Sequence, residues 1–125
     1  MAKLKKSILV VDDDPASRSL LREILRADDY QVLEAEDGEF ALELLETRPV
    51  DLMITDRSMP RVDGLELLSK LREKGKTVPA LMISAYGEES IWGQAIGLGA
   101  VDYLLKPFSA EDVLKVVRKA LGIKA

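Results

Sequence analysis

The stretch Ser7-Ile-Leu-Val-Val-Asp-Asp-Asp-Pro15 shows the strand-to-helix unit on which the rest of the chain is built. Residues 7–11 form a short apolar run rich in β-branched side chains, which is typical of a buried strand. Asp14 is a favourable N-cap and Pro15 a favourable first helical residue, so a helix is predicted to begin directly after the acidic turn. The apolar stripe of this helix is expected to consist of Leu20, Leu21, Ile24 and Leu25.

The alternation of strand and helix continues to the end of the chain. Further strands are predicted at residues 31–35, 52–55, 79–84 and 101–105. Helices are predicted at residues 37–47 and 88–97 and after the N-cap residues Asp63 and Ser109, and Glu66 has the capping-box spacing from Asp63. Such alternation implies right-handed crossovers and a parallel sheet with helices on both faces. The predicted fold class is α/β, a (βα)5 arrangement whose strand order the periodicity leaves open.

The composition suits one hydrophobic core. Apolar residues make up 47 % of the 125 residues, so a single domain over residues 1–125 is predicted. The later helices are expected to face this core with Phe40, Ala41, Leu44, Leu45, Leu65, Leu68, Leu71, Val113, Leu114, Val117 and Leu121.

Charge and residue usage exclude several classes of function. The net charge is −4 and both signs are spread along the chain, which argues against direct binding of nucleic acid. The absence of cysteine and histidine excludes disulfides, zinc-thiolate sites, histidine metal clusters and a Ser-His-Asp triad. No apolar run approaches the ~20 residues of a membrane span and no signal-peptide pattern opens the chain, so we expect a cytoplasmic protein without membrane contact.

Polar side chains stand where the predicted strands end. Residues 12–14 are all aspartate and follow the first strand, Asp56 follows the third, Ser84 ends the fourth, and Lys106 follows the fifth. In an open parallel sheet, functional sites lie outside the carboxyl ends of the strands. Carboxylates, a hydroxyl and an ammonium that converge at this edge predict a site for a hard cation and a phosphoryl group.

The chemistry of such a cluster is consistent with magnesium. Asp12, Asp13 and Asp56 would repel one another, and Mg2+ offsets that repulsion with oxygen ligands. Lys106 adds a second positive charge. The Asp56 carboxylate is then able to attack phosphorus, while the phosphoryl oxygens meet Mg2+, the Lys106 ammonium and the Ser84 hydroxyl.

Four stretches of the chain resemble the receiver domain of two-component response regulators. They are Ile8-Leu-Val-Val-Asp-Asp-Asp-Pro15, Pro49-Val-Asp-Leu-Met-Ile-Thr-Asp-Arg-Ser-Met-Pro-Arg-Val-Asp-Gly64, Ala80-Leu-Met-Ile-Ser-Ala85 and Gly99-Ala-Val-Asp-Tyr-Leu-Leu-Lys-Pro-Phe108. Each motif alone is weak, but four in this order, each at a strand end, form a specific pattern. The resemblance implies a flavodoxin-like sheet in the order 2-1-3-4-5, which is the strand order of this family.

The resemblance also implies a role for each matching residue. Asp56 is the expected phosphoacceptor, with Ser84 and Lys106 as its catalytic partners. Asp12, Asp13, Asp56 and the backbone carbonyl of Ser58 are the expected Mg2+ ligands. Ser84 and Tyr103 are the expected switch residues, and the bond from Lys106 to Pro107 is expected to be cis.

A few positions depart from the family pattern or stay ambiguous. Ser84 stands where threonine is commoner, which keeps the hydroxyl but loses the methyl group that restricts its rotamer. The bulky Tyr86 lies where the family admits the hydrolytic water, so a slow loss of the phosphoryl group is hypothesised. Trp92 is equally consistent with a core position and with an exposed anchor for a partner. The role of Arg57 is open.

The resemblance implies a phosphorelay switch that is not an enzyme beyond its own phosphotransfer and autodephosphorylation. A histidine kinase or histidine phosphotransfer protein would supply the phosphoryl group in trans. The helix at 88–97, the strand at 101–105 and the helix after Ser109 would then form the surface for a downstream output domain or protein, or for a homodimer.

Two alternatives stay open and a third is disfavoured. The chain is also consistent with a degenerate receiver that docks without phosphorylation, although the complete acidic set argues against this. A phosphatase with an aspartyl-phosphate intermediate would need a second carboxylate two residues after Asp56, where this chain has Ser58. A flavin or dinucleotide carrier is disfavoured because residues 12–14 would repel phosphates and no G-x-G-x-x-G motif is present.

Overall fold

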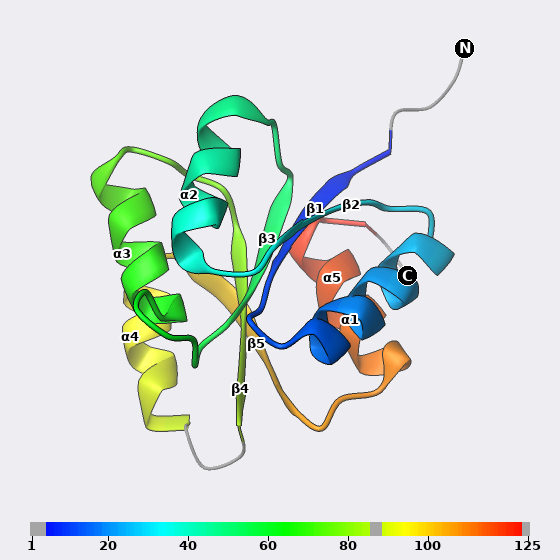
Figure 1. Cartoon of the computed structure of the whole chain (residues 1–125). Helices are drawn as coiled ribbons and strands as arrows, with labels where there is room; N and C mark the ends of the chain where they lie inside the picture. The colour runs from blue at the N-terminus through cyan, green and yellow to red at the C-terminus, as the bar shows by residue number, and fades with distance from the viewer. Residues whose placement is uncertain (1–4, 86–88, 124–125) are drawn as a thin grey trace.

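A five-stranded parallel sheet forms the centre of the molecule, and helices cover both of its faces (Figure 1). The computed structural model describes residues 5–85 and 89–123. The strand order is β2-β1-β3-β4-β5, which confirms the flavodoxin-like α/β arrangement. No helix in these two described segments is long and apolar enough to cross a membrane.

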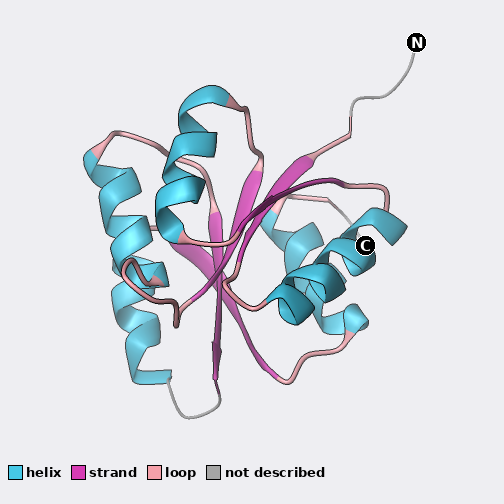
Figure 2. Cartoon of the chain, viewed as in Figure 1, coloured by secondary structure: helices cyan, strands magenta, loops and turns pink. Residues whose placement is uncertain are grey.

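Apart from the beginning of α4, the strands and helices that Figure 2 shows begin and end within about one residue of the predicted ranges. The strands are β1 (Ser7–Val11), β2 (Gln31–Ala35), β3 (Leu52–Asp56), β4 (Ala80–Ala85) and β5 (Ala100–Lys106). The helices are α1 (Pro15–Ala27), α2 (Gly38–Thr47), α3 (Gly64–Glu73), α4 (Trp92–Gly97) and α5 (Ala110–Ala120). A 3-10 turn at Glu89–Ile91 replaces the beginning of the helix expected at 88–97, whose first residue lies outside the described part of the chain.

Two apolar layers hold the helices to the sheet. On one face α1 and α5 pack against side chains such as Ile8, Ile54 and Leu81 (Figure 1). On the other face α2, α3 and α4 pack against side chains such as Leu9 and Met53. Successive residues of β1 therefore enter opposite layers, and both are fully buried. This explains why the central strands are continuous apolar runs in the sequence.

Two of the predicted core residues are exposed instead. Leu20 is 47 % exposed and Phe40 is 45 % exposed. The buried stripe of α1 runs through Leu21 and Leu25, and Leu20 precedes Leu21 by one residue, a rotation of about 100° around the helix. Phe40 is displaced in the same way from the buried Ala41 of α2. Neighbouring apolar residues on a helix cannot all face inward, and the predicted stripes were too wide.

Side-chain caps fix where most of the helices begin. Asp14, Asp37 and Asp63 accept hydrogen bonds from N–H groups in the first turns of α1, α2 and α3. At α5 the bonds between Ser109 and Asp112 are reciprocal, so the capping box is complete there. In contrast, the N-cap position of α4 is Ile91, which provides no side-chain cap, and the helix spans only 6 residues. The α4 helix is thus the least firmly anchored of the described helices.

The first residue of α3 must be glycine because the helix begins directly beneath the end of β3. A Cβ atom on Gly64 would lie 2.6 Å from the backbone oxygen of Asp56 and 3.0 Å from the Cα of Arg57. The Gly64 N–H donates to the Arg57 oxygen at 2.9 Å. This close approach sets the position of the β3 carboxyl end, where the polar residues gather.

We predict that Gly64→Ala destabilises the protein by roughly 1–3 kcal/mol, because the added methyl group must displace backbone. Gly93→Ala is the matched control, since a Cβ there meets nothing within 4 Å. In the interior of α4 this change should stabilise by up to about 1 kcal/mol. Urea denaturation of the two variants measures both effects, and equal stabilities would contradict the role given to Gly64.

Candidate functional site

Three carboxylates meet at the carboxyl edge of the two central strands. Asp12 directly follows β1, Asp56 ends β3, and the register pairs Val11 with Thr55, so Asp12 and Asp56 lie at corresponding positions of neighbouring strands. One carboxylate oxygen each of Asp12, Asp13 and Asp56 lie within 4.8 Å of one another. Asp12 and Asp56 are buried, whereas Asp13 is exposed. The structure therefore brings together the three aspartates that the sequence predicted as metal ligands.

The Asp12 side chain is held by one oxygen and leaves the other unpartnered. Its backbone N–H donates to the Ala35 oxygen at 3.1 Å, and its Oδ1 accepts from the Asp14 N–H at 2.9 Å. Its Oδ2 is buried and has no hydrogen-bond partner in the described structure. Burial, assisted by the charge of Asp56 and opposed by the Asp14 hydrogen bond, raises the pKa of Asp12 to about 6.

These features fit a divalent cation with oxygen ligands. An unpartnered buried carboxylate oxygen is costly unless an opposite charge satisfies it. Mg2+ takes oxygen ligands and is commonly held by one or two carboxylates, with water completing its shell. The donor set of Asp12, Asp13 and Asp56 therefore suits Mg2+ better than softer metals.

The Asp56 carboxylate accepts hydrogen bonds from two directions. Lys106, at the end of β5, donates from Nζ to Oδ2 at 2.7 Å, and the Ser58 N–H donates to Oδ1 at 3.0 Å. Burial opposes the charging of Lys106, but its hydrogen bond to Asp56 and the charges of Asp56 and Asp12 outweigh this effect. The pKa of Lys106 is therefore raised, and its ammonium stays charged beside Asp56.

The predicted switch residues lie on the strands beside Asp56. Ser84 on β4 is buried and sits one position beyond Ile83, the register partner of Asp56. No hydrogen bond joins Ser84 to Asp56 in the described residues. Tyr103 on β5 pairs with Met82, and its ring lies 4.6 Å from that of Trp92 at an interplanar angle of 52°. Trp92 is therefore half-buried and packs against Tyr103. Its side chain is neither fully in the core nor fully exposed, the two alternatives that the sequence left open.

Of the remaining predictions, the structure tests one and leaves two untested. The Lys106–Pro107 bond is cis, as expected from the family resemblance. Ser58 is exposed and contacts Asp56 through its N–H, while the ligand role of its carbonyl stays a prediction. Tyr86 lies outside the described residues, so the hypothesis about the hydrolytic water stays a prediction as well.

Two contributors to the site were not identified from the sequence. Arg18 on α1 donates from Nη1 to the backbone oxygen of Asp12 at 2.7 Å. Gly64 packs closely against the backbone of Asp56, where a side chain would not fit. An arginine one turn into a helix carries no distinctive pattern, but a glycine directly after an N-cap aspartate indicates a close backbone approach.

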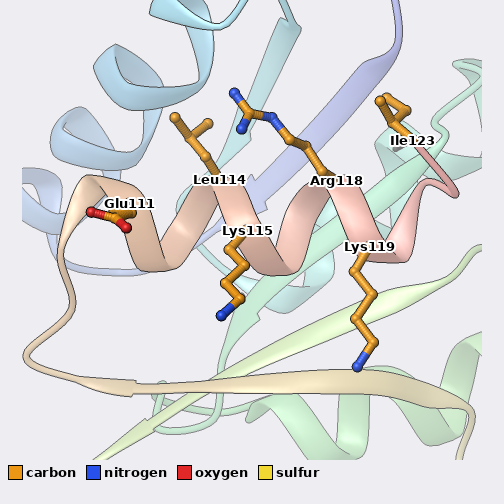
Figure 3. Close-up of a pocket in the computed structure, with 6 residues that line it drawn as sticks. All are labelled: Glu111, Leu114, Lys115, Arg118, Lys119 and Ile123. Atoms are coloured by element: carbon orange, nitrogen blue, oxygen red, sulfur yellow. The ribbon is translucent and has the colours of Figure 1, made fainter. Parts of the chain in front are cut away.

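A hollow of about 770 Å3 lies away from the acidic site, on the outer side of α5 (Figure 3). The side chains of Lys115 and Lys119 extend from the opposite side of this helix to those of Leu114 and Arg118 (Figure 3). Arg118 donates two hydrogen bonds, of 2.8 and 3.2 Å, to the Asp28 carboxylate. The hollow contains none of the predicted site residues.

Comparison with known proteins identifies the family. The family model of the response regulator receiver domain matches residues 8–118. The alkaline phosphatase synthesis transcriptional regulatory protein PhoP of Bacillus subtilis is 40 % identical over 118 residues, which are 94 % of this chain and 49 % of that protein. The response regulator MprA of Mycolicibacterium vanbaalenii is 42 % identical over 114 residues, 91 % of this chain and 49 % of MprA. The chain spans about half the length of these two relatives.

Solved structures agree with the sequence comparison. The receiver domain of NtrX from Brucella abortus has a TM-score of 0.87 at 34 % identity, covering 94 % of this chain and 99 % of that chain. The chemotaxis protein CheY4 of Vibrio cholerae has a TM-score of 0.89 at 29 % identity, covering 94 % and 100 %. The chain therefore belongs to the receiver domain family of response regulators. Such domains act in phosphorelay signalling, bind Mg2+ at an acidic pocket, and interact with histidine kinases and output domains.

We predict that Asp12→Asn stabilises the protein in Mg2+-free buffer. The pKa of Asp12 is raised above its ordinary value of 3.8 to about 6, so ionisation disfavours the folded state. For this group the free energy of unfolding is highest below pH 4, falls as the pH rises to 6, and then levels off. The variant should therefore exceed the native chain by on the order of 1–3 kcal/mol above pH 6, and the difference should vanish near pH 4.

Thermal unfolding in EDTA across pH 4–8 measures this difference. Asp13→Asn is the control, because Asp13 is exposed and its replacement should change stability less. A difference between Asp12→Asn and the native chain that does not depend on pH would refute the explanation.

Proposed function

We propose that this chain is a phosphorylation switch that accepts a phosphoryl group on Asp56 from a histidine kinase or a histidine phosphotransfer protein. The observation that carries the proposal is the buried Asp56 carboxylate, which is hydrogen-bonded to Lys106 and lies among the carboxylates of Asp12 and Asp13. Asp12, Asp13, Asp56 and the Ser58 carbonyl would hold the Mg2+ ion. When bound, Mg2+ neutralises charge on the phosphoryl oxygens.

The transfer follows from the groups at the site. An Asp56 carboxylate oxygen forms a bond to phosphorus as the P–N bond of the donor phosphohistidine breaks, and the imidazole nitrogen departs with the electron pair. The Lys106 ammonium is within reach of Asp56 and stabilises the incoming negative charge. The Ser84 hydroxyl, one register position beyond Asp56, is placed to donate to a phosphoryl oxygen. The activity proposed is limited to this self-phosphorylation and the later hydrolysis of the aspartyl phosphate.

The proposed output is a change in packing on the face made by α4, β5 and α5. Ser84 moves towards the phosphoryl group, and Tyr103 turns into the space that Ser84 leaves. The contact between Tyr103 and Trp92 couples this turn to α4, the helix that lacks a side-chain cap. Phosphorylation would thereby shift the population between two packings of this face.

This face also suits the docking that the proposal requires. Ile96 on α4 is 51 % exposed and Val101 on β5 is 50 % exposed, so apolar side chains lie on its surface. Such exposed apolar groups favour contact with an output domain, an output protein or a second copy of the chain. Direct nucleic-acid binding is not proposed for this chain, in keeping with its net charge of −4.

We predict that the native chain gains one phosphoryl group when incubated with Mg2+ and phosphoramidate or acetyl phosphate. Intact mass spectrometry measures the gain, and Asp56→Asn should show none because it lacks the nucleophilic oxygen. Lys106→Ala should keep Mg2+ binding but be phosphorylated at least tenfold more slowly. A native chain that binds Mg2+ yet gains no mass would contradict the proposed transfer and favour a receiver that acts by docking alone.

We predict that the fluorescence of Trp92 changes on phosphorylation, because its ring contacts that of Tyr103. Trp92 is the only tryptophan of the chain, so the emission reports one position. Ser84→Ala should be phosphorylated but show a smaller emission change, because the hydroxyl that initiates the switch is absent. An equal change in Ser84→Ala and the native chain would overturn the assigned role of Ser84.

A further inference from the structure

Arg18 lies behind the acidic site and contacts the backbone of one of its aspartates. Its Nη1 donates to the Asp12 backbone oxygen at 2.7 Å, a distance typical of a strong, charge-assisted hydrogen bond. The Arg18 side chain is 19 % exposed, so this bond is largely shielded from water. The guanidinium thus binds the backbone of Asp12, the residue whose side chain has the unpartnered carboxylate oxygen.

Glu34 on β2 holds the guanidinium in place. Its Oε1 lies 3.4 Å from Arg18 Nε, and its Oε2 lies 3.0 Å from Arg22 Nη1. The next residue of β2, Ala35, accepts the hydrogen bond from the Asp12 N–H at 3.1 Å. The end of β2 therefore secures Asp12 twice, directly through Ala35 and indirectly through Glu34 and Arg18.

Glu34 also compensates the charge of Arg18. An uncompensated cation behind Asp12 would oppose the binding of a second cation in front of it. Paired with Glu34, Arg18 supplies its hydrogen bond to Asp12 with much less of this repulsion. Arg22 contacts the same carboxylate, but within the described residues it forms no hydrogen bond or ion pair with Asp12. The chain therefore offers a comparison between two arginines that share Glu34.

We propose that Arg18 is a positioning residue for the metal site: it fixes the Asp12 main chain, and with it the unpartnered carboxylate oxygen, while Glu34 neutralises the charge of Arg18. This inference rests on the proposed function only for the identity of the cation as Mg2+. Outer groups that orient metal ligands commonly change metal affinity by about 10–100-fold when they are removed. The bond from Arg18 reaches the ligand's backbone rather than its carboxylate, so we expect an effect at the lower end of that range.

The test is calorimetric titration of the unphosphorylated chain with Mg2+, which needs no phosphodonor. Arg18→Met should weaken Mg2+ binding about tenfold, whereas Arg22→Met should leave the affinity within about twofold of the native value. At saturating Mg2+, the rate of phosphorylation of Arg18→Met should approach the native rate. A loss of rate that persists at saturating Mg2+ would assign Arg18 to the transfer itself and overturn the inference.

Glu34→Gln separates positioning from charge. In the native background Glu34→Gln should weaken Mg2+ binding, because the positive charge of Arg18 is then no longer compensated. In the Arg18→Met background it should have no further effect. Additive losses in the double variant would contradict the coupling of the two residues. If Arg18→Met does not fold, Arg18→Leu, which also lacks the donor, replaces it, and an unchanged affinity in either variant refutes the inference. If the native chain itself binds no Mg2+, the proposed metal site fails rather than the role of Arg18.

Discussion

The repulsion among three carboxylates within 4.8 Å is the constraint on which the rest of the site depends. Parallel strands bring their carboxyl ends to one edge, and the alternation of strand and helix in this chain makes that convergence unavoidable. The protein offsets part of the repulsion with Lys106, which reaches Asp56 from β5 across the intervening β4. Burial of Asp12, with a smaller contribution from the charge of Asp56, makes its ionisation unfavourable, and a cation at this site would offset that cost.

The surroundings of this site are rigid on one side and weakly held on the other. Strands β1 and β3 are buried on both faces, and α1, α2, α3 and α5 begin at side-chain caps, so the acidic edge is a fixed platform. The α4 helix is short and uncapped, and the ring of its Trp92 contacts the ring of Tyr103 on β5. A fixed reacting centre beside a loosely held element is the arrangement that a local charge change is able to act on.

Much of this arrangement could be predicted from the sequence, because strand ends carry functional residues in parallel sheets. Asp12, Asp56 and Lys106 were found in this way, and the structure places them together. The strand order came from the family resemblance, since periodicity carries no information on which strands are neighbours. The exposure of Leu20 and the bond from Arg18 to Asp12 depend on how α1 is rotated against β1 and β2. That rotation is set by packing between elements, which local sequence patterns do not encode.

The energies involved fit a switch of this kind. Moving a two-state equilibrium from 1:99 to 99:1 requires about 5.5 kcal/mol of differential stabilisation. A hydrogen bond to a charged group contributes roughly 1.5–3 kcal/mol, so about two to four new bonds to a phosphoryl group would be needed. Lys106 is already bonded to Asp56 before phosphorylation and therefore adds less than a full bond. The Ser84 hydroxyl makes no bond to Asp56 in this structure, so a bond from Ser84 to the phosphoryl group would be a full gain. In the proposed switch, Ser84 would therefore be the residue that distinguishes the two states, and Lys106 would serve both.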